Sequence, residues 1–290
     1  MDQQSKSEHA PSSPSIALAL GGGGARGIAH IHVIEVLDEL GLRPKMIAGS
    51  SIGAIMGAAM AAGMRGTDIR SHTLTAISRR GELMNRLWRL RPASFVEAVK
   101  GGLGLGRFNL ERVLDAFLPD AIPRDFADLA IPLKIMATDY YGQSEHVCAR
   151  GDLRQAIAAS AAIPALFRPV KIDGRVMIDG GVYNPVPFDH LHGKADIVIG
   201  VDVVGGPEGD GKTLPSRIDS LFGSGQLMMQ SIIAMKLRAH PPDIFLRPEV
   251  NRFRVLDFLR AEEVLTATAG VRDDLKRALE AAIEARLKSR

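Results

Sequence analysis

Cysteine and net charge are both scarce in this sequence, and each shortage excludes a class of protein. Its 290 residues include one cysteine, Cys148, so no disulfide can form within the chain and a reducing compartment is expected. A single thiol also lacks the ligand cluster of a structural zinc site, and we predict neither a metal centre nor a cofactor. Lysine and arginine total 36 against 33 acidic residues, an excess too small to indicate a nucleic-acid-binding protein.

Long, strongly apolar runs are missing as well. Residues 1–14 are polar and lack the apolar core of a secretory signal, so we expect a disordered lead-in. The 19 residues Met46–Met64 carry no charge and approach the length of a membrane span. Four glycines and two serines dilute this stretch, so a buried strand, turn and helix is the better interpretation. A cytoplasmic protein is expected, with peripheral contact at the inner face of the membrane as a further prediction.

Glycine-rich turns separate short apolar segments in the first part of the chain. Ser15–Leu20 has the pattern of a buried strand, and Gly27–Leu40 has apolar residues at helical spacing. Pro44–Ala48 is a second strand pattern, followed by a sharp turn and an alanine-rich helix to about Ala62. Strands that alternate with helices in this way predict an α/β fold with a parallel sheet.

The chain length suits one large domain, which we place at residues 15–248 with a helical extension packed on it at 249–290. Further elements are expected beyond residue 130: strands at 131–140 and 145–149, a helix at 152–162, a hairpin at 168–178, a strand at 195–203, a helix at 216–240, a strand at 243–247 and a charged helical tail at 261–288.

The segment from Arg79 to Arg107 differs in character from the rest. It carries seven basic residues against two acidic ones, contains the only tryptophan, Trp88, and closes in a glycine run. Two interpretations stay open. It is either a mobile basic insert that acts as a lid and meets anionic head groups, or a solvated helix whose aromatic side chains complete the core.

Residues 49–53 (GSSIG) have the pattern G-x-S-x-G and stand after an apolar strand and before a helix. In that setting a tight turn exposes the central serine at a helix N-terminus, and the flanking glycines let neighbouring backbone approach. Ser51 is therefore the candidate nucleophile. A serine- and glycine-rich helix cap is the competing structural interpretation.

Residues 22–27 (GGGARG) fit G-x-G-x-x-G, again between a strand and a helix. A dinucleotide-binding loop of this pattern is followed by an acidic residue about 20 residues further on. The sequence over 42–46 reads LRPKM and contains no acidic residue. The alternative is a loop whose N–H groups surround the negative charge of a tetrahedral acyl intermediate. Beside a serine turn, this oxyanion hole is the stronger interpretation.

A serine hydroxyl needs a base, and none of the eight histidines stands in an obvious catalytic motif. Asp179, followed by Gly180 and Gly181 at the end of a strand, is the better candidate. Burial beside Ser51 would raise the pKa of this carboxyl group and let it take the hydroxyl proton. A plain Asp-Gly turn is the competing interpretation.

Three blocks, at residues 22–27, 49–53 and 179–181, together resemble the patatin-like phospholipase family in its compact bacterial form. Ala159–Pro164 resembles a fourth block that the family carries before its aspartate, and the likeness covers roughly Ile16–Val203. The resemblance implies a three-layer α/β/α sandwich around a mainly parallel sheet, and a Ser–Asp dyad that acts on lipid acyl esters.

The resemblance assigns roles residue by residue. Ser51 would be the nucleophile and Asp179 its base, and the amides of Gly23, Gly24 and Ile52 would donate to the oxyanion. The other motif positions, with expected parts in the oxyanion hole, substrate binding or turn geometry, are Gly22, Arg26, Gly27, Gly49, Gly53, Gly180 and Gly181.

Three hypotheses about function are carried forward. The leading one is a serine acylhydrolase of phospholipase A, lysophospholipase or esterase type, in which water frees an acyl-enzyme formed on Ser51. The second is a lipid-binding or regulatory adaptor that keeps the fold and has little activity. The third is a Ser–His–Asp triad that uses His190, His192 or His240. The expected partners are a lipid ester substrate and an anionic membrane surface, without nucleic acid, and no oligomeric state is predicted.

Overall fold

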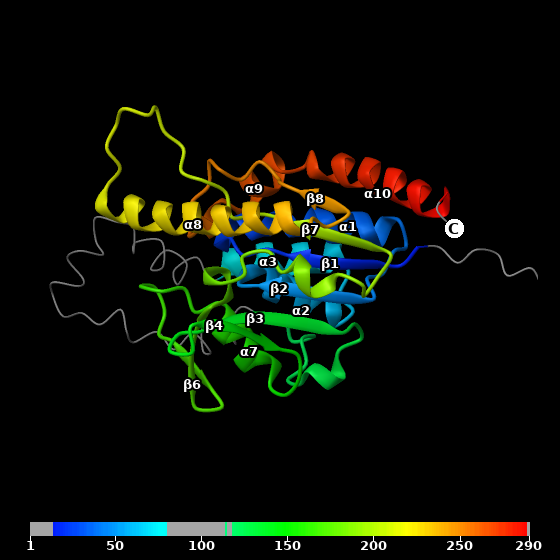
Figure 1. Ribbon diagram of the computed structural model, residues 1–290, viewed down its shortest axis with the longest axis horizontal. Coiled ribbons are helices and arrows are strands. Elements are labelled where there is room, and N and C mark those ends of the chain that lie inside the picture. The colour runs from blue at the N-terminus through cyan, green and yellow to red at the C-terminus, as the bar shows by residue number, and fades with distance from the viewer. Residues whose placement is uncertain (1–13, 80–113, 115–117, 289–290) are drawn as a thin grey trace, which may run out of the picture.

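A computed structural model describes residues 14–79, 114 and 118–288 (Figure 1). The predicted lead-in up to residue 13 and the part of the predicted basic insert from residue 80 onward lie outside these residues. An eight-stranded sheet runs through the described part of the chain. The strands are β1 (Ile16–Leu20), β2 (Met46–Ser50), β3 (Leu133–Asp139), β4 (Ser144–Cys148), β5 (Val170–Ile172), β6 (Arg175–Asp179), β7 (Ile197–Val201) and β8 (Ile244–Leu246).

The centre of the sheet is parallel, as the alternation of strands and helices predicted. Strands β3, β2, β1, β7 and β8 lie side by side in that order and run in one direction. Strands β4 and β6 pair with β3 in the antiparallel sense, and β5 pairs with β6. The carboxyl ends of the parallel strands therefore meet at one edge of the sheet, where ligand sites of such sheets usually lie.

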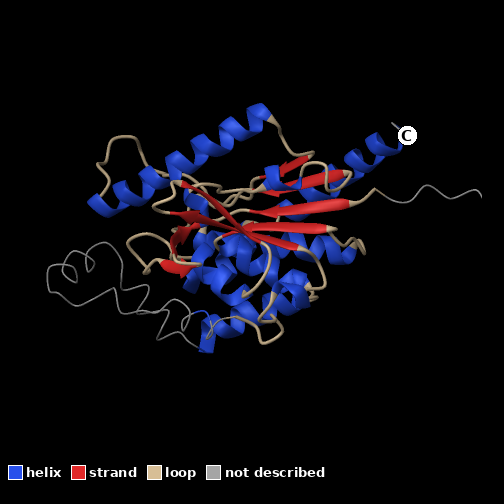
Figure 2. Ribbon diagram, turned by 60° about the horizontal axis from the view of Figure 1, so that its bottom comes forward, coloured by secondary structure: helices blue, strands red, loops and turns tan. Residues whose placement is uncertain are grey.

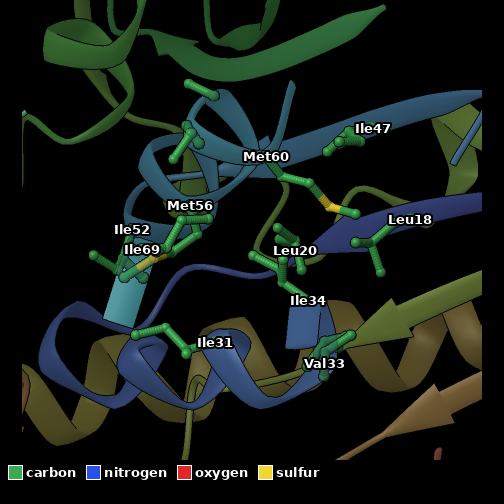
Figure 3. Close-up of a cluster of buried hydrophobic side chains, with 14 of the residues drawn as sticks. Leu18, Leu20, Ile31, Val33, Ile34, Ile47, Ile52, Met56, Met60 and Ile69 are labelled. Atoms are coloured by element: carbon green, nitrogen blue, oxygen red, sulfur yellow. The ribbon is translucent and has the colours of Figure 1, made fainter. Parts of the chain in front are cut away.

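Helices cover both faces of the sheet, which gives the three-layer α/β/α fold (Figure 2). On one face, Leu18 and Leu20 of β1 pack with apolar side chains of α1 and α2 (Figure 3). On the other face, Ala17 and Ala19 pack with the long helix α8. Because β1 is buried on both faces, all five of its residues are apolar. The helices are α1 (His30–Glu39), α2 (Ile52–Ala61), α3 (Gly66–Arg79), α7 (Leu153–Ser160), α8 (Arg217–Ala239), α9 (Ala261–Ala267) and α10 (Val271–Lys288).

Two predicted helices differ in detail from the observed ones. The first begins as a 3₁₀ helix, η1 (Gly24–Ala29), which lets the glycine loop turn tightly before α1 starts. The C-terminal tail is not one helix but two, because it breaks between α9 and α10 around Gly270, a poor helix former. The stretch Met46–Met64 folds as β2, a turn and α2, which confirms the interpretation preferred over a membrane span.

Candidate active site

The candidate nucleophile occupies a strained turn between β2 and α2. Ser51 has φ 54° and ψ −122°, a backbone conformation that a residue with a side chain adopts only when its surroundings enforce it. The turn also brings α2 close to β1: a Cβ on Gly53 would overlap the carbonyl oxygen of Leu20. The predicted strand, sharp turn and helix are therefore present at G-x-S-x-G.

The close approach of α2 to β1 at Gly53 predicts that a glycine-to-alanine substitution has opposite effects on stability at two helical glycines. Gly53→Ala is expected to lower the free energy of unfolding by about 1–3 kcal/mol, because the new methyl group has no room. Gly225→Ala, in α8 and with open space around it, is expected to raise that free energy by about 0.5–1 kcal/mol. Urea unfolding measures both, and a Gly53→Ala protein as stable as the wild type would contradict the crossing.

The topology of the sheet brings Asp179 to Ser51. Strand β4 occupies one edge of β3, so β2 and β6 share the other: β2 pairs up to Met136, and β6 takes over at Ala137. Because β6 runs antiparallel, its last residue, Asp179, meets the end of β2. The Ser51 hydroxyl donates a hydrogen bond to Asp179 Oδ2 at 2.6 Å, across 128 positions of sequence.

The surroundings of Asp179 hold its carboxyl group in place and make it more basic. Oδ1 accepts a hydrogen bond from the Gly181 amide at 2.7 Å, and the carbonyl of Asp179 accepts one from the Thr138 hydroxyl at 2.9 Å. Burial raises the pKa of Asp179 to about 6, although the hydrogen bonds from Ser51 and Gly181 act in the opposite direction. At neutral pH the group is mostly ionised and is a stronger base than an exposed aspartate.

The glycine loop lies directly against the candidate nucleophile. A Cβ on Gly22 would stand 3.3 Å from the Ser51 Cβ. The Gly22 amide is already used, since it donates to the Pro185 carbonyl at 2.9 Å. Within the described residues, the amides of Gly23 and Gly24 have no acceptor.

The Ile52 amide likewise has no acceptor among the described residues, because it begins α2, where the first turn lacks intrahelical partners. The three amides predicted as oxyanion donors are thus available. Their function stays a prediction.

The side chain of Arg26 is turned into the protein. Its Nε donates to the Phe253 carbonyl at 2.6 Å, and Nη1 donates to the Val204 carbonyl. Burial lowers the pKa of the guanidinium to about 10. These contacts tie the glycine loop to the segment after β7 and to the C-terminal region, so the geometry gives Arg26 a positioning role. Its expected contact with substrate stays a prediction.

The remaining motif glycines lie where the backbone is crowded. A Cβ on Gly27 would overlap the Ile52 side chain, and one on Gly180 would overlap the Met136 carbonyl. Gly49 faces the start of α2, where a Cβ would lie 2.5 Å from the Gly53 carbonyl oxygen. These glycines therefore permit the close packing of the loop, the turn and the end of β6.

Within the described residues, no hydrogen bond joins a histidine to Ser51 or Asp179. The three histidines of the triad hypothesis have other surroundings: His190 Nε2 lies 2.7 Å from Glu145 Oε2, and His192 Nε2 lies 3.2 Å from the His240 carbonyl. The geometry therefore favours the dyad over the triad.

Sequence reasoning assigned no role to the end of α7, which contacts both candidate catalytic residues. The buried Ser160 hydroxyl accepts a hydrogen bond from the Ser51 amide at 2.8 Å. The carbonyl of Ala162 accepts one from the Asp179 amide at 3.0 Å. Both residues belong to the block Ala159–Pro164, which the family resemblance had already singled out. One short segment thus anchors the candidate nucleophile and the candidate base relative to each other.

A cavity of about 470 Å³ lies away from this site, between α1, α3 and α10. Its Arg70 and Arg272 both pair with Glu35, at 2.6 and 2.7 Å. Arg272 also pairs with Glu39. Because these ion pairs join α1, α3 and α10, they belong to the packing of the C-terminal region.

The fold and these motifs define a family. The sequence profile of the patatin-like phospholipases matches residues 18–192, more than half of the chain, and the chain belongs to this family. It is similar to an uncharacterized NTE-family protein of Mycobacterium tuberculosis, with 39% identity over 199 residues that cover 68% of this chain and 51% of the relative. It is also similar to the neuropathy target esterase sws of Drosophila melanogaster, with 32% identity over 65% of this chain and 13% of that protein.

The chain spans about half the length of the first of these relatives. Among solved structures, VipD from Legionella pneumophila has a similar fold, with a TM-score of 0.50 and 15% identity over 94% of this chain and 68% of VipD. Across residues 14–79 and 118–288, no helix combines the length and the apolar character that crossing a membrane requires.

Proposed function

We propose that the protein is a serine hydrolase that cleaves carboxylic esters of lipids through an acyl-enzyme on Ser51. The observation that carries this proposal is the 2.6 Å hydrogen bond from the Ser51 hydroxyl to Asp179, at a strained turn that opens a helix. Membership of the patatin-like phospholipase family supports lipid acyl esters as the substrate class.

In the proposed first step, Ser51 Oγ attacks the ester carbonyl carbon while its proton passes to Asp179 Oδ2. Negative charge develops on the carbonyl oxygen, and the free amides of Gly23, Gly24 and Ile52 stabilise it. When the tetrahedral intermediate collapses, the ester C–O bond breaks and the leaving alcohol takes the proton from Asp179. The acyl chain is then bound to Ser51 as an ester.

The second step reverses these roles. Asp179 takes a proton from a water molecule as the water oxygen attacks the acyl carbon. Collapse of the second intermediate releases the fatty acid and returns the proton to Ser51. One buried carboxyl group serves both steps because its raised pKa, about 6, lies closer to working pH than that of an ordinary aspartate.

A panel of esters with increasing acyl length, run on wild type and Ser51→Ala, tests the proposal. We expect hydrolysis by the wild type and none above background by the variant. The acyl length and head group preferred in the panel separate phospholipase A, lysophospholipase and simple esterase. An absence of hydrolysis across the panel would instead favour a lipid-binding adaptor on the same fold.

The pH dependence of hydrolysis follows from the buried base. Because Asp179 must be ionised to accept the proton, kcat/KM for a soluble ester is expected to rise with pH up to about 6 and to level off above it. A histidine base would titrate in a similar range, so His190→Ala, His192→Ala and His240→Ala serve as controls. Each should keep both the rate and the profile, and a large loss in one of them would favour the triad.

Ser160 is expected to act as a positioning residue for the nucleophile. Ser160→Ala removes the acceptor of the buried Ser51 amide, so kcat should fall by about 10- to 100-fold while KM changes little. Ser50→Ala is the matched control, because the Ser50 hydroxyl is buried and has no hydrogen-bond partner within the described residues. Steady-state kinetics of the two variants test this, and equal losses in both would contradict the role.

A further inference from the structure

Between Ser220 and Met235, the outer face of α8 carries large apolar side chains and serines and no charged residue. Leu221, Met228 and Met235 follow one another at seven-residue spacing and are 56%, 63% and 57% exposed. From Ser220 to Met235 the sequence contains no acidic or basic residue. A surface helix ordinarily carries charged side chains opposite its buried face, so the outer face of α8 differs from that of a helix surrounded only by water.

The opposite face of α8 is held firmly on the sheet. Ile233 is buried in the cluster that includes Ala17 and Phe188. Near the end of the helix, Lys236 Nζ donates to Asp189 Oδ1 at 2.5 Å. Because these contacts fix the orientation of α8, the same apolar side chains always face outward from the molecular surface.

This surface continues to the candidate active site. A Cβ on Gly181 would lie 3.5 Å from the sulfur of Met229, so α8 packs against the turn that follows Asp179. The next two residues, Val182 and Tyr183, are themselves 44% and 48% exposed. Figure 1 shows α8 running across the front of the sheet. Large apolar side chains are therefore exposed both along α8 and beside the proposed base.

The size of the face decides between two occupants. The 16 residues Ser220–Met235 span about 24 Å of a helix about 10 Å wide, so the outer strip offers roughly 240 Å². A second copy of the chain would need roughly 800 Å² from each partner for a stable interface. A lipid surface has no such requirement, because it accepts apolar side chains one by one as they leave water.

We propose that the outer face of α8 docks in the plane of a lipid surface and meets its uncharged acyl region. The proposal rests on the proposed function in that docking brings Ser51 close to the esters of that surface. Because the stretch Ser220–Met235 holds no charge, its docking does not require anionic lipid and does not weaken with salt. It is thus distinct from the contact with anionic head groups predicted for the basic segment.

The single buried cysteine allows a site-specific test. Met228→Cys in a Ser51→Ala background is labelled with a polarity-sensitive fluorophore and mixed with phosphatidylcholine vesicles, which have no net charge. Cys148 does not compete, since burial raises the pKa of its thiol to about 11. Emission is expected to rise severalfold and shift to shorter wavelength, equally at low and high salt. The matched control is Leu287→Cys, an exposed apolar position on α10, which should not respond.

A second pair of variants measures affinity. Leu221→Glu combined with Met228→Glu is expected to lower vesicle affinity by about 100-fold, because two apolar side chains no longer leave water. Leu287→Glu should bind like the wild type. Unchanged emission from the Met228→Cys probe, or an equal change from both probes, overturns the proposal.

Two further outcomes also overturn the docking proposal. The first is vesicle binding that requires anionic lipid and low salt. The second is a fluorescence signal that grows with protein concentration in the absence of vesicles, because such a signal identifies a second copy of the chain as the occupant. The inactive background separates docking from chemistry. Docking without ester hydrolysis by the wild type would refute only the proposed function, and hydrolysis of soluble esters without docking would refute only this proposal.

Discussion

Ser51→Ala and Asp179→Asn are each expected to lower the rate of ester hydrolysis by about 10³-fold or more, with little further loss in the double variant. We expect the two groups to act as one unit, since the hydroxyl donates directly to the carboxylate at 2.6 Å. Removing either one leaves the other without a function in the proposed first step. Steady-state kinetics on a soluble ester measure all three variants, and losses that multiply in the double variant would contradict a shared step.

Thermal unfolding shows whether Asp179→Asn loses activity because the base is missing or because the protein is destabilised. The folded protein raises the pKa of Asp179 above its ordinary value, so the ionised group opposes folding, and stability is lost as pH rises through about 6. Replacing it by a neutral amide removes this cost, which is at most about 3 kcal/mol at neutral pH. We therefore expect Asp179→Asn to be no less stable than the wild type at neutral pH, with any advantage vanishing toward pH 4.

The second large effect is expected from the glycine loop. Removing the Gly24 N–H should lower kcat by about 10²–10³-fold with little change in KM, because the proposed oxyanion exists only in the transition state. Gly24→Val would not isolate this effect: Gly24 has φ 60°, and a Cβ there would overlap the Val255 carbonyl. Replacing the Gly24 amide by an ester, with glycolic acid in place of glycine, removes the N–H and adds no atom that collides.

The same ester replacement at Gly209, an exposed position with open space around it, is the matched control and should leave kcat unchanged. Thermal stability of both proteins is measured alongside. A Gly24 ester that raises KM and keeps kcat would indicate a loop that binds the ground state of the substrate.

Structural features that depend on residues close together in the chain could be predicted from the sequence. The pattern of Gly49, Ser51 and Gly53 after an apolar strand identifies a strand, turn and helix, because strand and helix periodicities and turn residues are local signals. The glycine loop and the Asp-Gly-Gly turn are local signals of the same kind. The resemblance to the patatin-like phospholipases then added the three-layer arrangement around a mainly parallel sheet and the expected pairing of Ser51 with Asp179.

The contacts that anchor the site could not be predicted in the same way. Ser160 supports Ser51 because α7 ends beside the turn after β2, a contact across 109 positions of sequence. No period or spacing within α7 indicates which of its polar atoms meets another segment. The side-chain partners of Arg26 could not be predicted for a related reason: its place in a glycine loop suggests contact with substrate, whereas its hydrogen-bond acceptors come from segments near residues 204 and 253.

The outer face of α8 illustrates a further limit. Apolar residues at helical spacing predict a helix with a buried side, and Ile233 and Leu237 provide one. The sequence does not show that Leu221, Met228 and Met235 lie on the opposite side of the helix. Which face of α8 is buried depends on how the helix packs on the sheet. The exposure of these side chains emerges only when the helix is placed on the sheet.

The central claim is that Ser51 is an activated nucleophile, and a fluorophosphonate tests it most directly. The reagent forms a covalent bond with an activated serine, and intact mass followed by peptide mapping locates the adduct. We predict one adduct per chain on Ser51 in the wild type, very slow labelling of Asp179→Asn and none of Ser51→Ala, with Ser50→Ala resolving the adjacent serine. An adduct on another residue, or a wild type that reacts no faster than Ser51→Ala, would contradict the account.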